Sequence, residues 1–217
     1  EVEKSISEYE KAAALSPNDY LLWLALGKAR ERNGDTQGAE KAFRRAVELA
    51  PNYADTRWTL GNCLLRQRKF EEGFEEIRAS ASNSEKHVLP AISTAWAISD
   101  GDTAQIRKNL GDSAKLNAFL AIFLIKQKRL DDAFNAWNGL SVDEKSNVYK
   151  TQSEELYNLL FNAGKIRYAK IIRSAIDGNQ GADVFGQITS GGFDSNIKQE
   201  KTDLFDWQIG AGAQPLI

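Results

Sequence analysis

The chain has 217 residues, enough for one elongated domain with a sizeable core. Apolar residues make up 42% of it and charged residues 27%, which are the proportions of a folded globular protein rather than a disordered one. A net charge of −2 and a pI near 5.6 argue against general nucleic-acid binding, which needs a clustered surplus of Lys and Arg.

The same composition bounds the cellular setting only in part. No apolar run reaches about 18 residues, the length needed to cross a bilayer, so this chain is not expected to insert into a membrane. No signal peptide is present and there is no initiator Met, so we expect a piece of a longer protein. The single cysteine, Cys63, excludes an internal disulfide but does not identify the compartment. The basic stretch 165–173 is interpreted as a solvated helix face rather than a phosphate-binding patch.

A repeat appears at the start of the chain. Residues 4–18 (KSISEYEKAAALSPN) and 38–52 (GAEKAFRRAVELAPN) have the same order of small, aromatic and apolar residues, and both end in Pro-Asn. The units are separated by 34 positions, which places Tyr9 over Phe43. A recurrence at this distance predicts a repeated structural unit.

Two full units follow, in residues 20–53 and 54–83. The first carries a small residue at Gly27, a large one at Phe43 and a proline at Pro51. A 34-residue unit with this order of residues resembles the tetratricopeptide repeat. The resemblance implies two antiparallel helices per unit and an all-α, right-handed superhelical solenoid of stacked units, with residues 1–18 supplying the second helix of a preceding repeat.

Local signals in these units explain the pattern. The loop Asn33-Gly34-Asp35 has a glycine that permits a left-handed turn and an aspartate that caps the next helix. Gly27 and Gly61 are expected where helix backbones approach closely, and Phe43 is expected to fill the gap between units. Pro51 ends the second helix because it cannot continue one.

Three degenerate units follow, in residues 87–112, 113–140 and 150–177. We expect a turn at residues 100–102 and a helix that either starts near Pro90 or bends there. The chain should therefore contain about five helical hairpins, forming one solenoid over residues 1–178.

A glycine-rich extension, residues 179–217, contains two short β-like runs. It either packs on the last helix or begins a truncated β-sandwich domain. Part of it resembles the opening of carbohydrate-binding jelly-roll modules, and a similar segment after such repeats in bacterial exopolysaccharide and cell-envelope proteins. The matching positions are Gly191, Gly192, Phe193, Asp194, Phe205, Asp206 and Trp207, with Ser190 where that pattern has Asn.

Residues for chemistry are scarce, so no catalytic, cofactor-binding or metal-binding residue is predicted and no cofactor is expected. His87 is the only histidine and is expected to be exposed between helices, while Cys63 is expected to be a packed thiol. The acidic runs 71–76 and 130–132 are interpreted as solvated helix faces.

The predicted binding surface is the concave face, which in tetratricopeptide repeats is lined by the first helix of each unit. By that resemblance the concave residues are Leu21, Leu24, Lys28, Glu31, Arg32, Asp55, Trp58, Asn62, Leu65 and Arg66. The degenerate units add, less securely, Lys115, Ala118, Ile122, Lys126, Glu154, Asn158 and Phe161. Lys28 and Asn62 match part of the carboxylate clamp of some relatives, but Leu24 and Trp58 replace its polar groups. An apolar centre with basic edges favours a peptide with one hydrophobic anchor. Alternatively, Leu24 and Trp58 are covered by the neighbouring hairpin or by the extension.

The leading functional hypothesis is a non-enzymatic scaffold that binds a protein or peptide on this face, in a bacterial envelope or polysaccharide-export system. A second hypothesis is a spacer that positions a carbohydrate-binding module beyond the C-terminus. A third is an enzyme whose catalytic part lies outside this chain.

Overall fold

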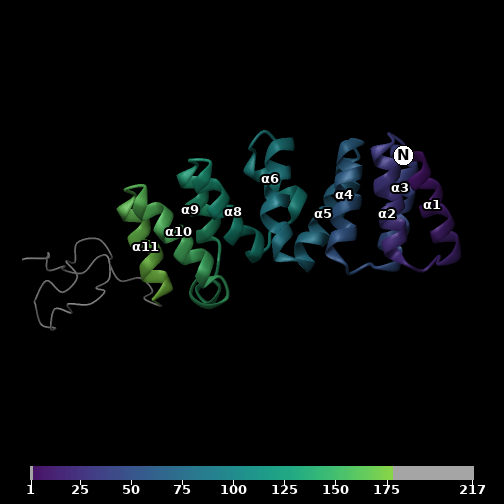
Figure 1. Ribbon diagram of the computed structural model, residues 1–217. Helices are drawn as coiled ribbons and strands as arrows, with labels where there is room; N and C mark the ends of the chain where they lie inside the picture. The colour runs from purple at the N-terminus through teal and green to yellow at the C-terminus, as the bar shows by residue number, and fades with distance from the viewer. Residues whose placement is uncertain (1, 178–217) are drawn as a thin grey trace, which may run out of the picture.

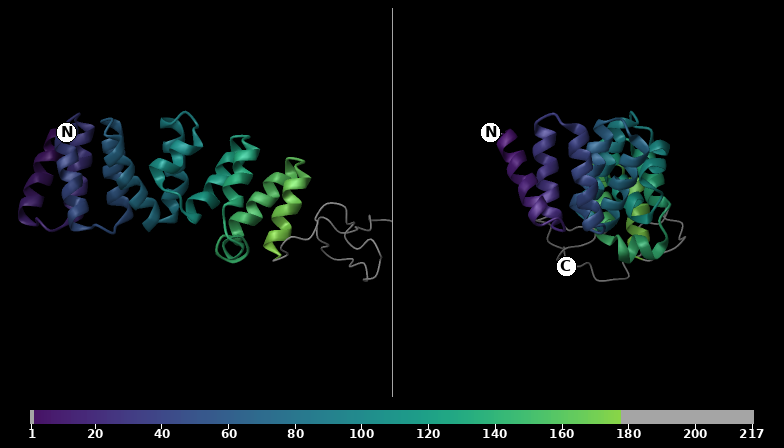
Figure 2. Two further views of the ribbon diagram at one scale, coloured as in Figure 1. Left: turned by 180° about the vertical axis from the view of Figure 1, so that it is seen from behind. Right: turned by 90° about the vertical axis from the view of Figure 1, so that its right-hand side faces the viewer.

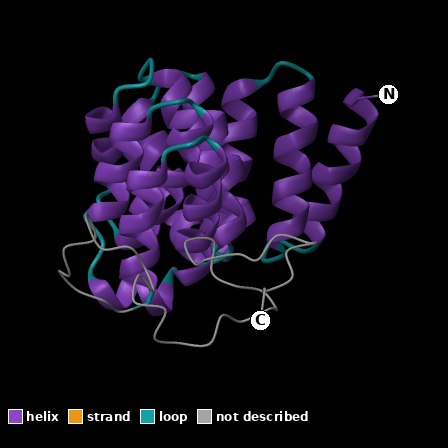
Figure 3. Cartoon of the chain, turned by 90° about the vertical axis from the view of Figure 1, so that its left-hand side faces the viewer, coloured by secondary structure: helices purple, strands orange, loops and turns teal. Residues whose placement is uncertain are grey.

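The computed structural model describes residues 2–177, and within that range it contains helices and no strands (Figures 1 and 3). The α-helices are α1 (Val2–Leu15), α2 (Tyr20–Arg32), α3 (Thr36–Leu49), α4 (Ala54–Arg66), α5 (Phe70–Asn83), α6 (Val88–Ile98), α7 (Thr103–Leu110), α8 (Ala114–Lys126), α9 (Leu130–Asn138), α10 (Lys150–Asn162) and α11 (Ile166–Ile176). Short 3-10 and π-type turns, η1 (Glu85–His87) and η2 (Glu144–Val148), precede α6 and α10.

The helices pair into antiparallel hairpins that stand side by side in chain order (Figures 1 and 2). The pairs are α2–α3, α4–α5, α6–α7, α8–α9 and α10–α11, and α1 packs on α2 in the place of the second helix of an earlier repeat. Successive hairpins are joined through α3–α4, α5–α7, α6–α8 and α8–α10 contacts. The predicted all-α fold of about five stacked hairpins is therefore confirmed. The β-type runs and the jelly-roll resemblance predicted for residues 179–217 lie outside the described residues.

The hairpin turns share one backbone geometry. Gly34 has φ +80°, as predicted, and Gly164 has φ +71°. Arg68 and Lys128 adopt φ of 61° and 62° in the corresponding turns, although each carries a side chain. In all four turns the amide of the next residue donates to a carbonyl five positions back, for example from Lys69 to Leu64. The fold therefore imposes a left-handed turn even where the sequence lacks glycine.

The predicted helix ends are also present. The Asp35 carboxylate accepts a hydrogen bond from the Gly38 amide at 2.8 Å and caps α3, which ends at Leu49, just before Pro51. Pro90 lies in the first turn of α6, so that helix starts near the proline.

The glycines of the first helices give room to large side chains. A Cβ on Gly27 would lie 2.3 Å from the Phe43 ring, and a Cβ on Gly61 would lie 2.8 Å from Cγ1 of Ile77. Backbone approach had been expected at both sites. At Gly27 the nearest group is instead an aromatic side chain, and at Gly61 both Ile77 and the Gly73 carbonyl oxygen, 3.0 Å away, are close.

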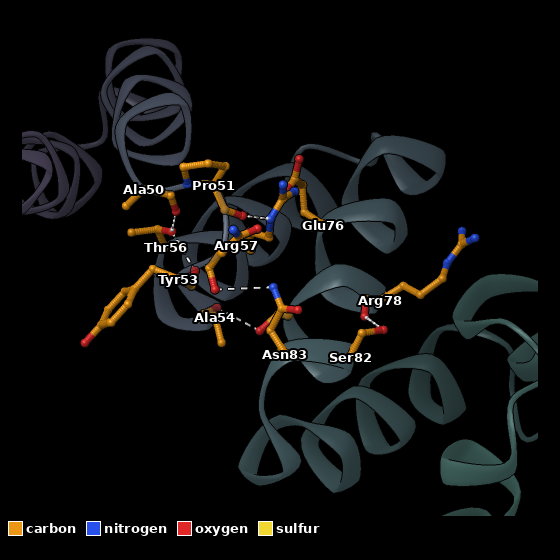
Figure 4. Close-up of polar contacts among 12 residues, drawn as sticks. Ala50, Pro51, Tyr53, Ala54, Thr56, Arg57, Glu76, Arg78, Ser82 and Asn83 are labelled. Atoms are coloured by element: carbon orange, nitrogen blue, oxygen red, sulfur yellow. Dashed lines mark hydrogen bonds and ion pairs between the residues drawn. The ribbon is translucent and has the colours of Figure 1, made fainter.

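Polar contacts fasten the loop between α3 and α4 to the next hairpin (Figure 4). The Arg57 guanidinium donates to the Pro51 carbonyl and pairs with the Glu76 carboxylate at 2.8 Å. At the end of α5, the Asn83 amide donates to the Asn52 carbonyl at 3.3 Å. The loop between α3 and α4 is thereby tied to α5 at its C-terminal end, and Arg57 of α4 is tied to the middle of α5.

Candidate partner-binding surface

Four of the predicted concave residues are exposed on α2 and α4. They are Leu21, Lys28, Arg32 and Arg66, and the Leu21 side chain is 54% exposed. We call these four residues the α2–α4 surface. The Arg66 guanidinium pairs with the Glu31 carboxylate, so the two helices meet at one edge of this surface.

Two predicted residues contribute little to it. Leu24 is only 9% exposed and packs in a cluster with Phe43 and Leu60, and Leu65 is only 8% exposed. A Cβ on Gly73 would lie 2.7 Å from Leu65, so Leu65 faces the interior of its own hairpin. The apolar centre expected on the concave face is thus largely core.

Asn62 is half-buried, and its side-chain amide donates to the Trp58 carbonyl at 2.8 Å on its own helix. One of its two amide protons is therefore already used. This reduces its capacity to bind a peptide carboxylate together with Lys28.

Asp55 and Trp58 meet residues of the following hairpin. The Trp58 ring stacks on the His87 imidazole, with centroids 4.9 Å apart and an angle of 18° between planes. The Asp55 carboxylate accepts from Lys86 at 2.8 Å and from His87 Nε2 at 3.2 Å. The prediction that His87 is exposed is wrong, because this junction closes over it and leaves it buried. The stacking contact covers Trp58 with a residue that follows its own hairpin. Coverage by the neighbouring hairpin was one of the two alternatives expected for Trp58.

Charge and burial oppose each other at this junction. Lys86, whose ammonium hydrogen-bonds Asp55, lowers the pKa of that carboxyl, with smaller contributions from His87 and Lys28. Burial lowers the pKa of His87, while Asp55 acts in the opposite direction. The Ser80 hydroxyl donates its proton to the Ala54 carbonyl at 2.8 Å, and its oxygen lies 2.6 Å from His87 Nδ1, while Nε2 faces Asp55.

A serine, a histidine and an aspartate are thus linked in one chain of contacts, but not as a nucleophile with its base. Ser80 is completely buried, and its hydroxyl proton is used in the hydrogen bond to the Ala54 carbonyl. No substrate reaches a hydroxyl in that position, so the contacts join α4, α5 and η1 structurally. Cys63 is also fully buried, as predicted, and burial raises the pKa of its thiol.

Tyr20 and Tyr53 were missed by the sequence analysis. Their rings lie 5.3 Å apart at the N-terminal ends of α2 and α4, and Tyr53 is 48% exposed. Tyr20 directly precedes Leu21 in the sequence, so the tyrosine pair extends the exposed apolar area at this end. Their spacing of 33 residues, close to the repeat length, was the signal that could have found them.

The less secure residues of the degenerate units are dispersed among different environments. Ala118 and Ile122 are buried, Lys115 donates to the Ser82 carbonyl at 3.0 Å, and Lys126 pairs with Glu155 at 3.4 Å. Of the remaining three, Glu154 and Phe161 are half-buried and Asn158 is exposed. They do not extend the α2–α4 surface as a continuous apolar stripe.

Residues 2–177 provide neither a metal site nor a membrane-spanning helix. No three His, Cys, Asp or Glu side chains in this range come together as a metal site. None of the helices in this range has the length and apolar character needed to cross a membrane.

The match to a known family lies in the N-terminal part of this chain. A family model described as a tetratricopeptide repeat matches residues 1–54 and 24–86. The peroxisomal targeting signal receptor of Candida albicans is 24% identical over 110 residues, covering 51% of this chain and 18% of the receptor. The E3 ubiquitin-protein ligase CHIP of Arabidopsis thaliana is 30% identical over 74 residues, covering 34% of this chain and 27% of the ligase.

Among solved structures, the tetratricopeptide repeat domain of P58(IPK) is similar over 84% of this chain and 57% of that one, with 16% identity and a TM-score of 0.37. The chain spans about a quarter or less of the length of the curated relatives described above. The family match in residues 1–86 lies on α1 to α5, where the paired helices and the 34-residue spacing are most regular. Residues 1–86 of the chain therefore consist of tetratricopeptide repeats, which form a protein–protein interaction domain.

Proposed function

We propose that this chain is a non-enzymatic interaction module that binds an acidic segment of a partner protein on the α2–α4 surface. The observation that carries the proposal is the composition of that surface, where three cations, Lys28, Arg32 and Arg66, accompany one exposed apolar residue, Leu21. A segment with carboxylates and one apolar anchor residue complements it in charge and polarity.

The charges of this area support an acidic ligand. The carboxylates nearest to the surface are already paired, since Glu31 contacts Arg66 and Asp55 contacts Lys86. Within residues 2–177, neither Lys28 nor Arg32 forms an ion pair. Two cations are therefore available to an incoming anion without breaking an existing pair.

The relatives support recognition of a protein segment. Several are receptors for a peroxisomal targeting signal, as their names state, and their similarity to this chain covers regions of 58 to 119 residues. We extend to this chain only the general activity, binding of a segment of another protein. The signal bound by those receptors is not assigned to it.

The absence of catalysis is part of the proposal, and burial of Ser80 and Cys63 supports it. The envelope and exopolysaccharide setting stays a prediction, and the relatives named above come from a yeast and a plant. The spacer alternative depends on residues 179–217, which lie outside the described residues, so no structural observation favours it.

Selection of peptides from a random display library against the immobilised chain tests the proposal. We expect the selected peptides to be enriched in Asp and Glu around one large apolar residue. Binding of a selected peptide should weaken with added salt, because the contacts are exposed charges. The double variant Lys28→Glu, Arg32→Glu should lower affinity about tenfold or more, since each reversal turns an attraction into a repulsion.

The matched control is Lys41→Glu, an exposed lysine on α3, which should leave affinity within about twofold. Selected peptides without acidic enrichment would contradict the proposal. So would a peptide whose affinity responds equally to the α3 control and to the double variant.

A further inference from the structure

A cavity lies away from the α2–α4 surface, between residues of α5, α6 and α8. Its volume is about 360 Å³, in the lower part of the range of small-molecule pockets, which is roughly 300–1,000 Å³. Six apolar residues line it: Ala81, Val88, Ala91, Leu110, Ala114 and Leu116. The polar residues of its lining are Arg78, Ser82, Ser113, Lys115 and Tyr149, and no carboxylate is among them.

The cavity exists because the third hairpin has a short second helix. α7 has 8 residues, whereas α5, against which it packs, has 14. α7 ends at Leu110, and the chain turns away at Gly111, where φ is +85°. Ala81 and Ser82 in the last turn of α5 and Leu110 at the end of α7 all border the cavity.

Two cations, Arg78 and Lys115, are among the lining residues. The Arg78 Cδ lies 3.5 Å from the position of a Cβ on Gly111, so the side chain passes over the end of α7. Figure 4 shows the Arg78 guanidinium extending away from the polar contacts of α4 and α5. Within residues 2–177, Arg78 forms no ion pair, and Lys115 donates only to the Ser82 carbonyl at 3.0 Å.

We propose that this cavity binds a small amphipathic carboxylate, with the carboxylate at Arg78 and Lys115 and the alkyl chain against the alanines and leucines of the lining. An anion gains from two cations with no competing acid in the lining. An apolar chain gains from removal of its surface from water. A cationic or fully polar ligand gains from only one of these features or from neither. This site is distinct from the α2–α4 surface, and the proposed function does not depend on it.

A titration of the isotope-labelled chain with decanoate, below its micelle-forming concentration, tests the proposal by amide chemical shifts. We expect saturable shifts centred on residues 81–83 and 113–116. Butyrate should bind more than tenfold more weakly because its chain buries less apolar surface. Decyltrimethylammonium, which has the same chain and the opposite charge, should not shift these amides.

Variants locate the charge and the chain separately. The double variant Arg78→Gln, Lys115→Gln should weaken decanoate binding at least about fivefold, the size expected for exposed charge-assisted contacts. Ala114→Leu should weaken it by filling the cavity. Lys108→Gln is the matched control, because Lys108 lies on α7 but does not line this cavity, and it should bind decanoate as the unmodified chain does.

The comparison of ligands on the unmodified chain does not depend on any variant being folded. Lack of saturable decanoate binding would overturn the proposal. Equal affinity for decanoate and decyltrimethylammonium, shifts centred outside the cavity, or equal losses in the double variant and the Lys108→Gln control would overturn it as well.

Discussion

The two full repeats and the fourth, degenerate hairpin differ in the residues that fill the space between their two helices. In all three, a small residue on the first helix and a large residue on the second are separated by the same number of positions. Gly27 faces Phe43 and Gly61 faces Ile77, in each case 16 positions later in the chain. In the fourth hairpin the same spacing separates Ala121 from Trp137, and both are fully buried or nearly so. The position of the small and large residues is retained while their volumes change, so the hairpin tolerates different packing at one register.

The joints between hairpins also differ in these regions. Near the N-terminus, Glu40 on α3 pairs with Lys69 at 2.7 Å, immediately before α5. Farther along, the Trp137 indole on α9 donates to the Ser153 hydroxyl on α10 at 3.0 Å, and both residues are buried. The N-terminal joint thus includes a largely buried carboxylate in an ion pair, whereas the C-terminal joint has a buried hydrogen bond between uncharged side chains in addition to the exposed Lys126–Glu155 pair.

Removal of the Trp137 side chain should have the largest effect on this comparison. Trp137→Ala should lower the free energy of unfolding by about 3–5 kcal/mol, because it leaves a cavity and removes the hydrogen bond to Ser153. Urea denaturation measures the loss, and hydrogen exchange should show it first in α8 to α11, since neighbouring repeats are coupled mainly to each other. An equal loss of hydrogen-exchange protection in α2 and α3 would contradict the idea that the N-terminal and C-terminal joints are stabilised independently.

Exchanging glycine and alanine at the small-residue position of two hairpins tests whether this position is packed against the large residue 16 positions later. Gly27→Ala should destabilise by about 1–3 kcal/mol, because the added methyl would lie 2.3 Å from the Phe43 ring. Ala121→Gly should also destabilise, by about 1–2 kcal/mol, but through lost packing and lower helix propensity. Thermal unfolding measures both. As a control, Gly139→Ala should be close to neutral, because its nearest neighbour would be 3.5 Å away.

The charged joint should be sensitive to pH. Burial raises the pKa of Glu40, but hydrogen bonds from Lys69 and Arg44 outweigh it and lower the pKa to about 2. Because the folded value lies below the unfolded one of about 4.3, this stabilisation is present above that value and is lost as the pH falls towards 2. Glu40→Gln should cost about 1–2 kcal/mol at pH 7.

The same variant should lose less stability than the unmodified chain between pH 5 and pH 2, that is, over about the interval between the two pKa values. Denaturation at a series of pH values measures this difference. Trp137→Ala serves as the comparison, because its cost should not depend on pH in that interval. Parallel pH profiles for Glu40→Gln and the unmodified chain would contradict the role of this carboxylate.

The turns should give the smallest effect and one of opposite sign. Arg68→Gly and Lys128→Gly should each stabilise by about 0.5–1 kcal/mol, because φ values of 61° and 62° are strained for residues with a Cβ. Both side chains are exposed, so little packing is lost. The reverse change, Gly34→Arg, should destabilise by a similar amount. A lower melting temperature for Arg68→Gly would show that the Arg68 side chain stabilises the fold by more than its backbone strain destabilises it.

Much of the fold was predictable from the sequence because its signals are local. The Asn33-Gly34-Asp35 turn, the proline that follows α3 and the repeat spacing act over a few residues or one period, and each is found in the structure. The candidate surface was less predictable. Lys28 and Arg32 are exposed as expected on the first helix, but Leu24 and Leu65 are buried by side chains from other turns and helices.

By itself, the sequence determined which segments are helical, where they turn and how they pair, because hydrogen bonding, capping and side-chain spacing act along the chain. Only the tertiary structure decided that His87 is buried against Trp58, since these residues come from different hairpins. It also decided that the short α7 leaves a cavity beside α5. Burial depends on the surface presented by distant segments, and no local pattern in one segment contains that information.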